Sequence, residues 1–184
     1  MTGPTYAAPP GGLPAQTERL SDRALFTESF AVIPHGVMRD IVTSRLPLWD
    51  DTRAWILARP MTGFAETFAQ YAMEVAPGGG SDRPEPEPGA EAALFVLDGA
   101  MTLSIGRQDH GLSAGGFAYV PPETDWRVRN TGDQPVRFMW IRKAYEAVSG
   151  LPYPDPIVTH EQEVQSVAMP DTEGAWATTR FVDP

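Results

Sequence analysis

Three carboxylates lie close together near the middle of the chain. Glu85 and Glu87 alternate with prolines in the run PEPEP, and Glu91 follows four residues later. Carboxylate oxygens suit Mg²⁺ or Mn²⁺, so one hypothesis is an oxygen-ligated metal site. The alternative is structural, because a Pro-Glu-Pro-Glu-Pro run favours a stiff, extended segment. We favour this second interpretation and expect the acids to be solvated.

An indole stands in the other part of the sequence that could form a site. Trp126 lies on a predicted strand together with Arg127 and Arg129. Successive side chains of a strand point to opposite faces. Arg127 and Arg129 therefore share one face and Trp126 lies on the other, so the three cannot all point inward. Trp126 either fills the interior of the fold or lines a pocket for a small anionic ligand. The candidate pocket-lining residues are Trp126, Trp140 and Glu91.

The three histidines, His35, His110 and His160, are scattered along the chain. The first two fall in predicted turns and the third in the C-terminal segment, so we expect solvated or locally hydrogen-bonded rings. The chain has no cysteine, which excludes thiol and disulfide chemistry. The residues therefore predict no catalytic group, no cofactor-binding residue and no metal ligand.

The chain is acidic, with 24 Asp and Glu against 14 Lys and Arg and a formal charge of −10. This balance argues against a nucleic-acid or anionic-membrane partner, because phosphate contacts need clustered Lys and Arg. We see no basic-then-apolar signal peptide and no apolar run long enough to span a bilayer. A cytoplasmic location is the expectation.

Short apolar segments, punctuated by many of the 19 prolines and 17 glycines, predict an all-β sandwich or barrel. Asp98-Gly99 favours a tight hairpin between two of them. The Gly-rich run after Val75 is expected to end a strand, and residues 106–111 to form a turn. A short helical turn is expected at Leu20–Leu25. The predicted strands are Phe30–Pro34, Val37–Ser44, Trp55–Arg59, the later part of Phe64–Val75, Ala92–Leu97, Met101–Ile105, Phe117–Val120, Trp126–Asn130, Val136–Ile141 and an extended segment in Ile157–Val167.

Composition divides the chain into three parts. Residues 1–19 are rich in Pro, Gly and Ala, which predicts a flexible arm. Residues 20–145 hold the predicted barrel. Residues 146–184 begin with a proline-rich stretch and are expected to form an irregular linker or extension.

Two segments resemble the signature motifs of the cupins, a family of jelly-roll barrels. In words, the first motif is Gly, five residues, His-x-His, three or four residues, Glu, six residues, Gly. Counting back from Gly99 places Ala92 at the Glu position, and the His-x-His positions fall within the Pro84–Pro88 run. The resemblance thus implies a barrel whose first set of metal ligands is missing.

The second cupin motif is Gly, five residues, Pro-x-Gly, two residues, His, three residues, Asn. Gly115, Pro121 and Asn130 match it, whereas Glu123 replaces the second Gly and Trp126 replaces the His. An indole cannot coordinate a metal. The frame of the motif is kept and its ligand is lost.

Longer segments resemble the N-terminal half of the (S)-ureidoglycine aminohydrolases. They are residues 91–99 (EAALFVLDG), 112–122 (LSAGGFAYVPP) and 138–145 (FMWIRKAY), with weaker similarity at residues 23–25 and 34–37. The family's proteins are bicupins that release ammonia from (S)-ureidoglycine to give (S)-ureidoglycolate in purine degradation. Their manganese site lies in the C-terminal cupin, and their N-terminal cupin is metal-free.

This resemblance implies that the chain is the non-catalytic half of such a protein, ending at Pro184, where the second barrel is expected to begin. No catalytic residue of the family can be assigned to a position here, and activity of the chain alone is not expected. The implied partners are a second cupin domain or a second copy of the chain in a homodimer. A non-enzymatic cupin that binds a small molecule and a cupin that serves only as an assembly module are the other interpretations.

Overall fold

The computed structural model describes residues 25–26, 30–33, 45–58 and 67–182. The predicted helical turn at Leu20–Leu25 lies almost wholly outside these residues, and the predicted strand Val37–Ser44 and His35 lie wholly outside them. Leu25 itself is in a strand. The described part of the chain is all-β, as the sequence predicted, and it contains no helix. Consequently no helix in it could cross a membrane.

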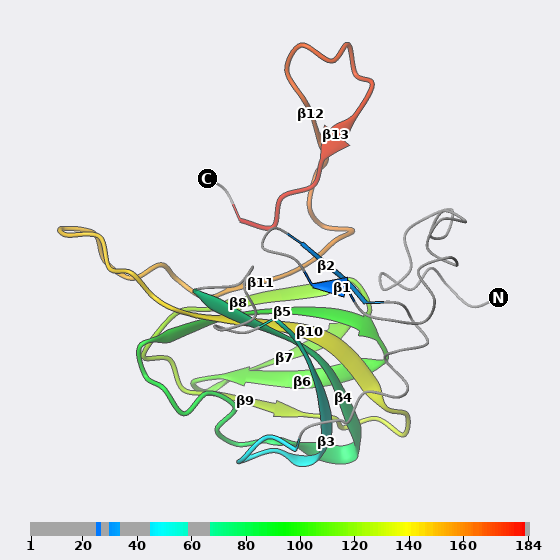
Figure 1. Cartoon of the computed structure of the whole chain (residues 1–184), viewed down its shortest axis with the longest axis vertical. Coiled ribbons are helices and arrows are strands. Elements are labelled where there is room, and N and C mark those ends of the chain that lie inside the picture. The colour runs from blue at the N-terminus through cyan, green and yellow to red at the C-terminus, as the bar shows by residue number, and fades with distance from the viewer. Residues whose placement is uncertain (1–24, 27–29, 34–44, 59–66, 183–184) are drawn as a thin grey trace.

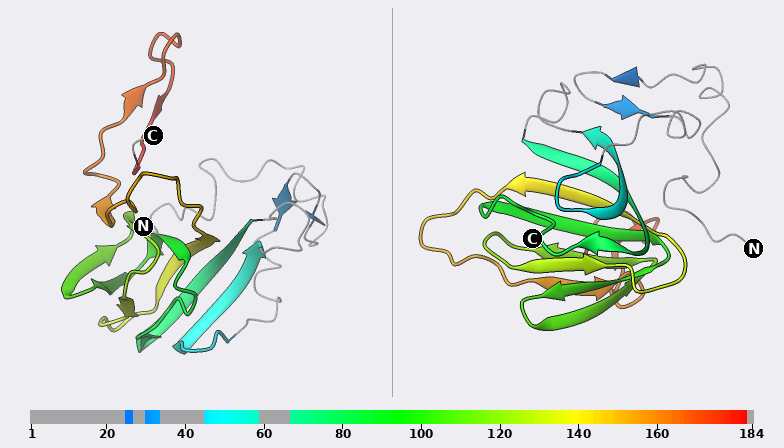
Figure 2. Two further views of the ribbon diagram at one scale, coloured as in Figure 1. Left: turned by 90° about the vertical axis from the view of Figure 1, so that its left-hand side faces the viewer. Right: turned by 90° about the horizontal axis from the view of Figure 1, so that it is seen from below.

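The main sheet follows the order β11-β8-β5-β10-β4-β9-β6-β7, with β3 paired to the free side of β4. It curves into a nearly closed barrel (Figures 1 and 2). The strands in it are β3 (Asp50–Ala58), β4 (Phe68–Ser81), β5 (Ala90–Asp98), β6 (Ala100–Ile105), β7 (Gln108–Ser113), β8 (Gly116–Val120), β9 (Trp126–Arg129), β10 (Val136–Ala144) and β11 (Ile157–His160). A separate small pair joins β1 (Leu25–Phe26) to β2 (Ala31–Val32).

Strand β4 connects the two layers of the barrel. Its first part pairs with β10 and β3, whereas Gly80 and Ser81 at its end pair with β9. Gly80 has a φ of 141°, and a Cβ there would lie 2.0 Å from the carbonyl oxygen of Val128. Only glycine therefore lets β4 approach β9 closely enough to turn the corner. The predicted end of the strand at the glycines is wrong, because these glycines bend the strand and do not stop it.

The core lies inside the barrel and is built from alternate residues of its strands. On β5, Ala92, Leu94 and Val96 are buried and alternate with half-exposed residues, and on β10 Phe138 and Trp140 do the same. This period of two is what a strand with one face in a core requires. The inward side chains thus form one apolar cluster.

Two local predictions are wrong. Asp98-Gly99 does not close a hairpin, because β5 pairs with β8 and β10 while β6 pairs with β7 and β9. The chain crosses from one layer to the other at Gly99. The turn predicted at 106–111 is confined to Gly106 and Arg107, and the rest of it belongs to β7. β7 was predicted as a turn because most of its residues are polar. Polar residues are expected on a strand that has one face in water.

The C-terminal segment contributes to the main sheet. Ile157–His160, within the predicted extended segment, form β11 and pair with β8. Beyond β11, β12 (Val167–Ala168) and β13 (Ala177–Thr178) form a hairpin that projects from the barrel (Figure 1). We call this hairpin, residues 166–179, the arm. A final short segment returns to the barrel, where Phe181 stacks on Phe117 of β8 at 4.6 Å.

Candidate functional site

The first motif can be placed on the structure by counting from Gly79 at the bend of β4. After five intervening residues come Glu85 and Glu87 at the His-x-His positions, and after four more intervening residues comes Ala92. Glu85 and Glu87 lie in the segment between β4 and β5. Two carboxylates thus stand where the resemblance places two imidazoles.

A guanidinium occupies the place between these carboxylates. Nε of Arg142 lies 2.6 Å from Oε2 of Glu85, and its Nη2 lies 2.6 Å from Oε1 of the same residue and 3.0 Å from Oε2 of Glu87. Arg142 is on β10, directly across from Ala92 of β5 and Ala69 of β4. Because both neighbours are alanines, the long side chain has room to extend past them to the carboxylates.

The two acids differ in their exposure to solvent. The side chain of Glu85 is 4% exposed, whereas that of Glu87 is 72% exposed. The expectation that both acids are solvated is therefore wrong for Glu85. A backbone N–H of Glu87 donates to Oε1 of Glu85 at 3.0 Å, which fixes the carboxylate further. Arg142 therefore pairs with one buried carboxylate, that of Glu85, and with one exposed carboxylate, that of Glu87.

Burial and charge oppose each other at this ion pair. Burial raises the pKa of the Glu85 carboxyl above its ordinary value, and the Glu87 N–H and the Arg142 guanidinium only partly offset that effect. Burial acts to lower the pKa of Arg142, but the neighbouring Glu85 and Glu87 carboxylates outweigh it and raise that pKa. Arg142 therefore stays charged, and Glu85 is the group that titrates.

The ligand positions do not fit a metal ion. Both carboxylates are already engaged by Arg142, Ala92 carries no donor, and Trp126 is an indole. No cluster of three or more His, Asp or Glu with metal-binding geometry occurs in the described parts of the chain. A cationic side chain thus neutralises these acids where a divalent cation is expected in a metal-bearing relative. The oxygen-ligated metal hypothesis finds no support in this geometry.

Behind the ion pair, indoles fill the barrel interior. Trp126 is 6% exposed and Trp140 is 2% exposed, and their rings meet edge-to-face at 6.1 Å. Trp49 adds a third indole 5.6 Å from Trp140. The Arg142 guanidinium lies 6.0 Å from the centre of the Trp140 ring, within range of a cation–π attraction. The structure thus brings Trp126 and Trp140 into contact in the barrel interior.

The remaining candidates lie elsewhere. Glu91 is on the other face of β5 and accepts a hydrogen bond of 2.8 Å from the Tyr119 hydroxyl, so it does not join Trp126 and Trp140. Burial, followed by this Glu91 contact, raises the pKa of Tyr119. Arg127 is exposed, and Arg129 pairs with Asp82 at 2.8 Å. Neither arginine reaches the indoles.

The two described histidines lie on β7 and β11, the strands at the two ends of the main sheet's order. His110 is on β7 and not in the predicted turn; it is half-exposed and shares a face with the buried Leu112, while His160 ends β11. A ring nitrogen of His160 is 2.9 Å from the carbonyl oxygen of Ala114. The backbone N–H of Gln162 donates to Nδ1 of the same ring at 3.2 Å, which is the local hydrogen bonding predicted for His160.

Arg142 is the functional residue that sequence reasoning missed. It ends the run Val136-Arg-Phe-Met-Trp-Ile-Arg142, in which every second residue from Val136 points inward. Extending that alternation by one step places a charged residue on the inward face, and a charge there needs an opposite partner. The Glu-rich run places two acids at ligand positions of the first motif, so the signal for the pair was present in the sequence.

The comparisons with known proteins agree with this architecture. Residues 71–142 match the family model described as the cupin domain. A curated relative, the (S)-ureidoglycine aminohydrolase of Escherichia coli K12, is 26% identical over 133 residues, which are 71% of this chain and 49% of that protein. The chain therefore spans about half the length of this relative.

Two solved structures resemble the chain over most of its length. A crystal structure of a glyoxylate-induced protein from Pseudomonas aeruginosa is 57% identical, with a TM-score of 0.82 over 98% of this chain and 65% of that one. Protein Ylba from Escherichia coli is 23% identical, with a TM-score of 0.72 over 83% of this chain and 61% of that one, and supports the fold alone. With its strand order, motif frame and family match, the barrel of this chain is a cupin domain.

Proposed function

We propose that this chain is a ureidoglycine aminohydrolase-like cupin that acts as the non-catalytic half of such an enzyme. The observation that carries the proposal is the position of the Arg142 guanidinium, which binds the two carboxylates at the ligand positions. The distant similarity to the Escherichia coli aminohydrolase supplies the reaction class, which is release of ammonia from (S)-ureidoglycine. On this proposal the metal and the substrate contacts belong to a second cupin domain.

Ammonia release from (S)-ureidoglycine tests this proposal. The chain alone, supplied with Mn²⁺, is expected to release ammonia no faster than buffer with Mn²⁺. The Escherichia coli aminohydrolase serves as the positive control in the same assay. Manganese-dependent release by this chain, abolished by chelation, would show that it carries its own active site and would overturn the proposal.

The arm favours assembly as a second role. Trp176 is 63% exposed and Val167 is 65% exposed, and both lie on the arm that projects from the barrel (Figure 1). A two-stranded hairpin is marginal in water by itself, and large exposed apolar side chains are typical of a protein interface. We infer that the arm packs against a second copy of the chain, giving a homodimer. The packed indoles favour this assembly role over ligand binding inside the barrel.

Sedimentation velocity over a range of concentrations tests the dimer. The wild-type chain is expected to sediment as a dimer and Trp176→Ser to shift towards monomer. Leu151→Ser is the matched control, because Leu151 is 67% exposed but lies outside the arm. A wild-type chain that stays monomeric at high concentration would contradict this role, as would equal effects of the two substitutions.

A further inference from the structure

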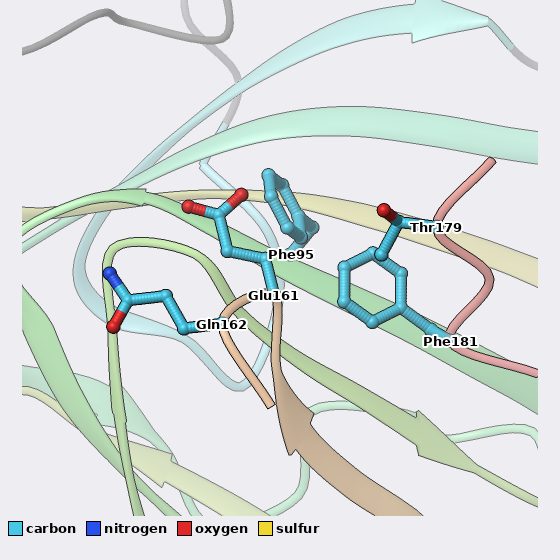
Figure 3. Close-up of a pocket in the computed structure, with 5 residues that line it drawn as sticks. All are labelled: Phe95, Glu161, Gln162, Thr179 and Phe181. Atoms are coloured by element: carbon cyan, nitrogen blue, oxygen red, sulfur yellow. The ribbon is translucent and has the colours of Figure 1, made fainter. Parts of the chain in front are cut away.

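A cavity of about 490 Å³ lies outside the barrel interior, between the main sheet and the returning C-terminal segment (Figure 3). Its residues come from three parts of the chain. Phe95 comes from β5, Glu161 and Gln162 follow β11, and Thr179 and Phe181 come from the segment after the arm. The volume falls in the range of small-molecule sites.

Aromatic rings form the apolar walls of the cavity. The Phe181 ring stacks on Phe117 at 4.6 Å and lies tilted against Phe95 at 5.8 Å. Phe95 and Phe181 are both half-buried, and both line the cavity. The stacking on Phe117 fixes Phe181 in place and gives the cavity a preformed wall.

A carboxylate provides the charged group of the cavity. The backbone N–H of Glu161 donates to the carbonyl oxygen of Gly115 at 2.9 Å, which anchors the residue. Gly115 has a φ of 89°, and a Cβ on it would lie 2.7 Å from Oε1 of Glu161. The first glycine of the second motif therefore leaves room for this carboxylate. Among the described residues, no cation lies within ion-pair distance of it.

The surrounding chemistry selects a cation. A carboxylate binds an ammonium or amidinium group through charge-assisted hydrogen bonds. The faces of Phe95 and Phe181 can attract the same charge and pack against a planar body. The side chain of Gln162 at the cavity adds a neutral hydrogen-bonding group, whereas the Thr179 hydroxyl is already 2.6 Å from Oγ of Ser166 (Figure 3). An anion is excluded by Glu161 and by the net charge of −10.

We propose that this cavity binds a small organic cation with an aromatic or planar body. The site lies on the outer face of the sheet, away from Arg142 and the indoles. It is therefore independent of the function proposed above, and either proposal can fail without the other. Nothing in the cavity requires a metal or a covalent step.

Benzylamine is a suitable probe, with benzyl alcohol and benzoate as neutral and anionic analogues of the same ring. In a titration of the ¹⁵N-labelled chain followed by NMR, benzylamine is expected to shift the amide signals of Gln162, Thr179 and Phe181. Benzyl alcohol is expected to bind more weakly and benzoate not to shift these signals. Failure of benzylamine to shift them at millimolar concentration would overturn the proposal.

Two isosteric substitutions test whether the charge of Glu161 is the one that binds benzylamine. Glu161→Gln is expected to weaken benzylamine binding by about tenfold or more, the scale of one lost charged hydrogen bond. Glu163→Gln removes the same charge two residues away, on an exposed side chain outside the cavity, and is expected to leave the affinity unchanged. Equal weakening by both would mean only general attraction to an acidic surface and would overturn the site.

A third variant tests the aromatic wall. Phe181→Leu keeps an apolar side chain but removes the ring face, so benzylamine affinity is expected to fall while the barrel signals stay unchanged. Unaltered affinity in this variant would contradict the role of the ring. Thermal unfolding of each variant, compared with wild type, verifies that the chain is folded before it is titrated.

Discussion

Arg142 of β10 and Glu85 of the segment between β4 and β5 form a two-point ion pair, with both contacts at 2.6 Å. The residues are 57 positions apart in the sequence, and the pair fastens the segment between β4 and β5 to β10. In this cupin the guanidinium of Arg142 supplies the positive charge that the cupin motif would obtain from a metal ion. Loss of one partner leaves the other buried without compensation, and that asymmetry can be measured.

Arg142→Met is expected to lower the free energy of unfolding by about 3 kcal/mol, because it strands the buried Glu85 carboxylate. The double variant Glu85→Gln/Arg142→Met is expected to be more stable than Arg142→Met alone, since no unpaired charge remains. Urea unfolding measures both. Arg137→Met is the control, because its pair with Glu74 involves an arginine that is 58% exposed and is worth about 1 kcal/mol or less. A double variant less stable than Arg142→Met would contradict the account.

The stability of the chain is expected to carry a pH dependence from Glu85. Its pKa is raised in the folded state, so the folded chain holds this proton more tightly than the unfolded chain does. The contribution to stability is full below the ordinary carboxyl pKa and is lost as pH rises through the raised value. Wild type should therefore lose stability relative to Glu85→Gln as pH rises from about 4 to neutral. Urea unfolding of both proteins across this pH range measures the difference in their unfolding free energies. If wild type instead gains stability relative to Glu85→Gln as pH rises, the attraction of Arg142 for the Glu85 carboxylate outweighs the effect of burial on its pKa.

Asn130, the last residue of the second motif, is expected to stabilise the fold through the hydrogen bonds of its side chain. It is 1% exposed, and its amide donates to the carbonyl oxygens of Val75 at 2.9 Å and Gln134 at 2.8 Å, while its side-chain oxygen accepts from the Gly132 N–H at 3.0 Å. Asn130→Ala is expected to cost about 1–3 kcal/mol of unfolding free energy by leaving these groups unpaired. Asn130→Asp should cost more at neutral pH, because it also buries a charge.

Chemical denaturation measures the two Asn130 variants. Gln134→Ala is the matched control, since the hydrogen bond uses only the backbone of Gln134 and its side chain is exposed. Its effect should stay within about 0.5 kcal/mol. Equal losses of unfolding free energy in Asn130→Ala and Gln134→Ala would contradict this role of the Asn130 side chain.

Gly80 is expected to be the glycine that the fold tolerates least. A Cβ at this position would meet the Val128 carbonyl oxygen at 2.0 Å, so Gly80→Ala must separate β4 from β9. The combined overlap and backbone strain should cost about 3 kcal/mol or more. Gly111→Ala, where no atom lies within 4 Å of the added Cβ, should be close to neutral. Thermal unfolding of the two variants compares them, and a Gly80→Ala chain as stable as Gly111→Ala would be inconsistent with this bend.

The fold was predictable where short apolar runs are bounded by turn residues. Ala92–Leu97 was identified as a strand because it is a continuous apolar run, but the predicted burial of both faces is wrong, since alternate residues are half-exposed. Val136–Ile141 was identified as the last strand of the barrel. The strand β7 was missed because its exposed face is polar and only Leu112 is fully buried. The crossing at Gly99 was also missed, because a local turn preference carries no information about which strand becomes the neighbour.

The candidate site was predictable only in part. Motif spacing located the positions of Trp126 and of Glu85 and Glu87, and the geometry shows that these side chains do not form a metal site. Spacing could not show that Glu85 is buried, because its burial depends on Arg142 arriving from a strand that lies 57 residues further along. The cavity beside Phe181 escaped prediction for the same reason, since it forms only when the C-terminal segment returns to β5 and β8.

The central claim is that the Arg142 guanidinium stands where a metal-bearing cupin holds its ion. Calorimetric titration of the purified, metal-stripped chain with Mn²⁺ at neutral pH tests it most directly. The account predicts no stoichiometric binding, because neither Glu85 nor Glu87 is free to act as a ligand. Binding of one Mn²⁺ per chain, lost when Glu85 is replaced by Gln, would contradict it.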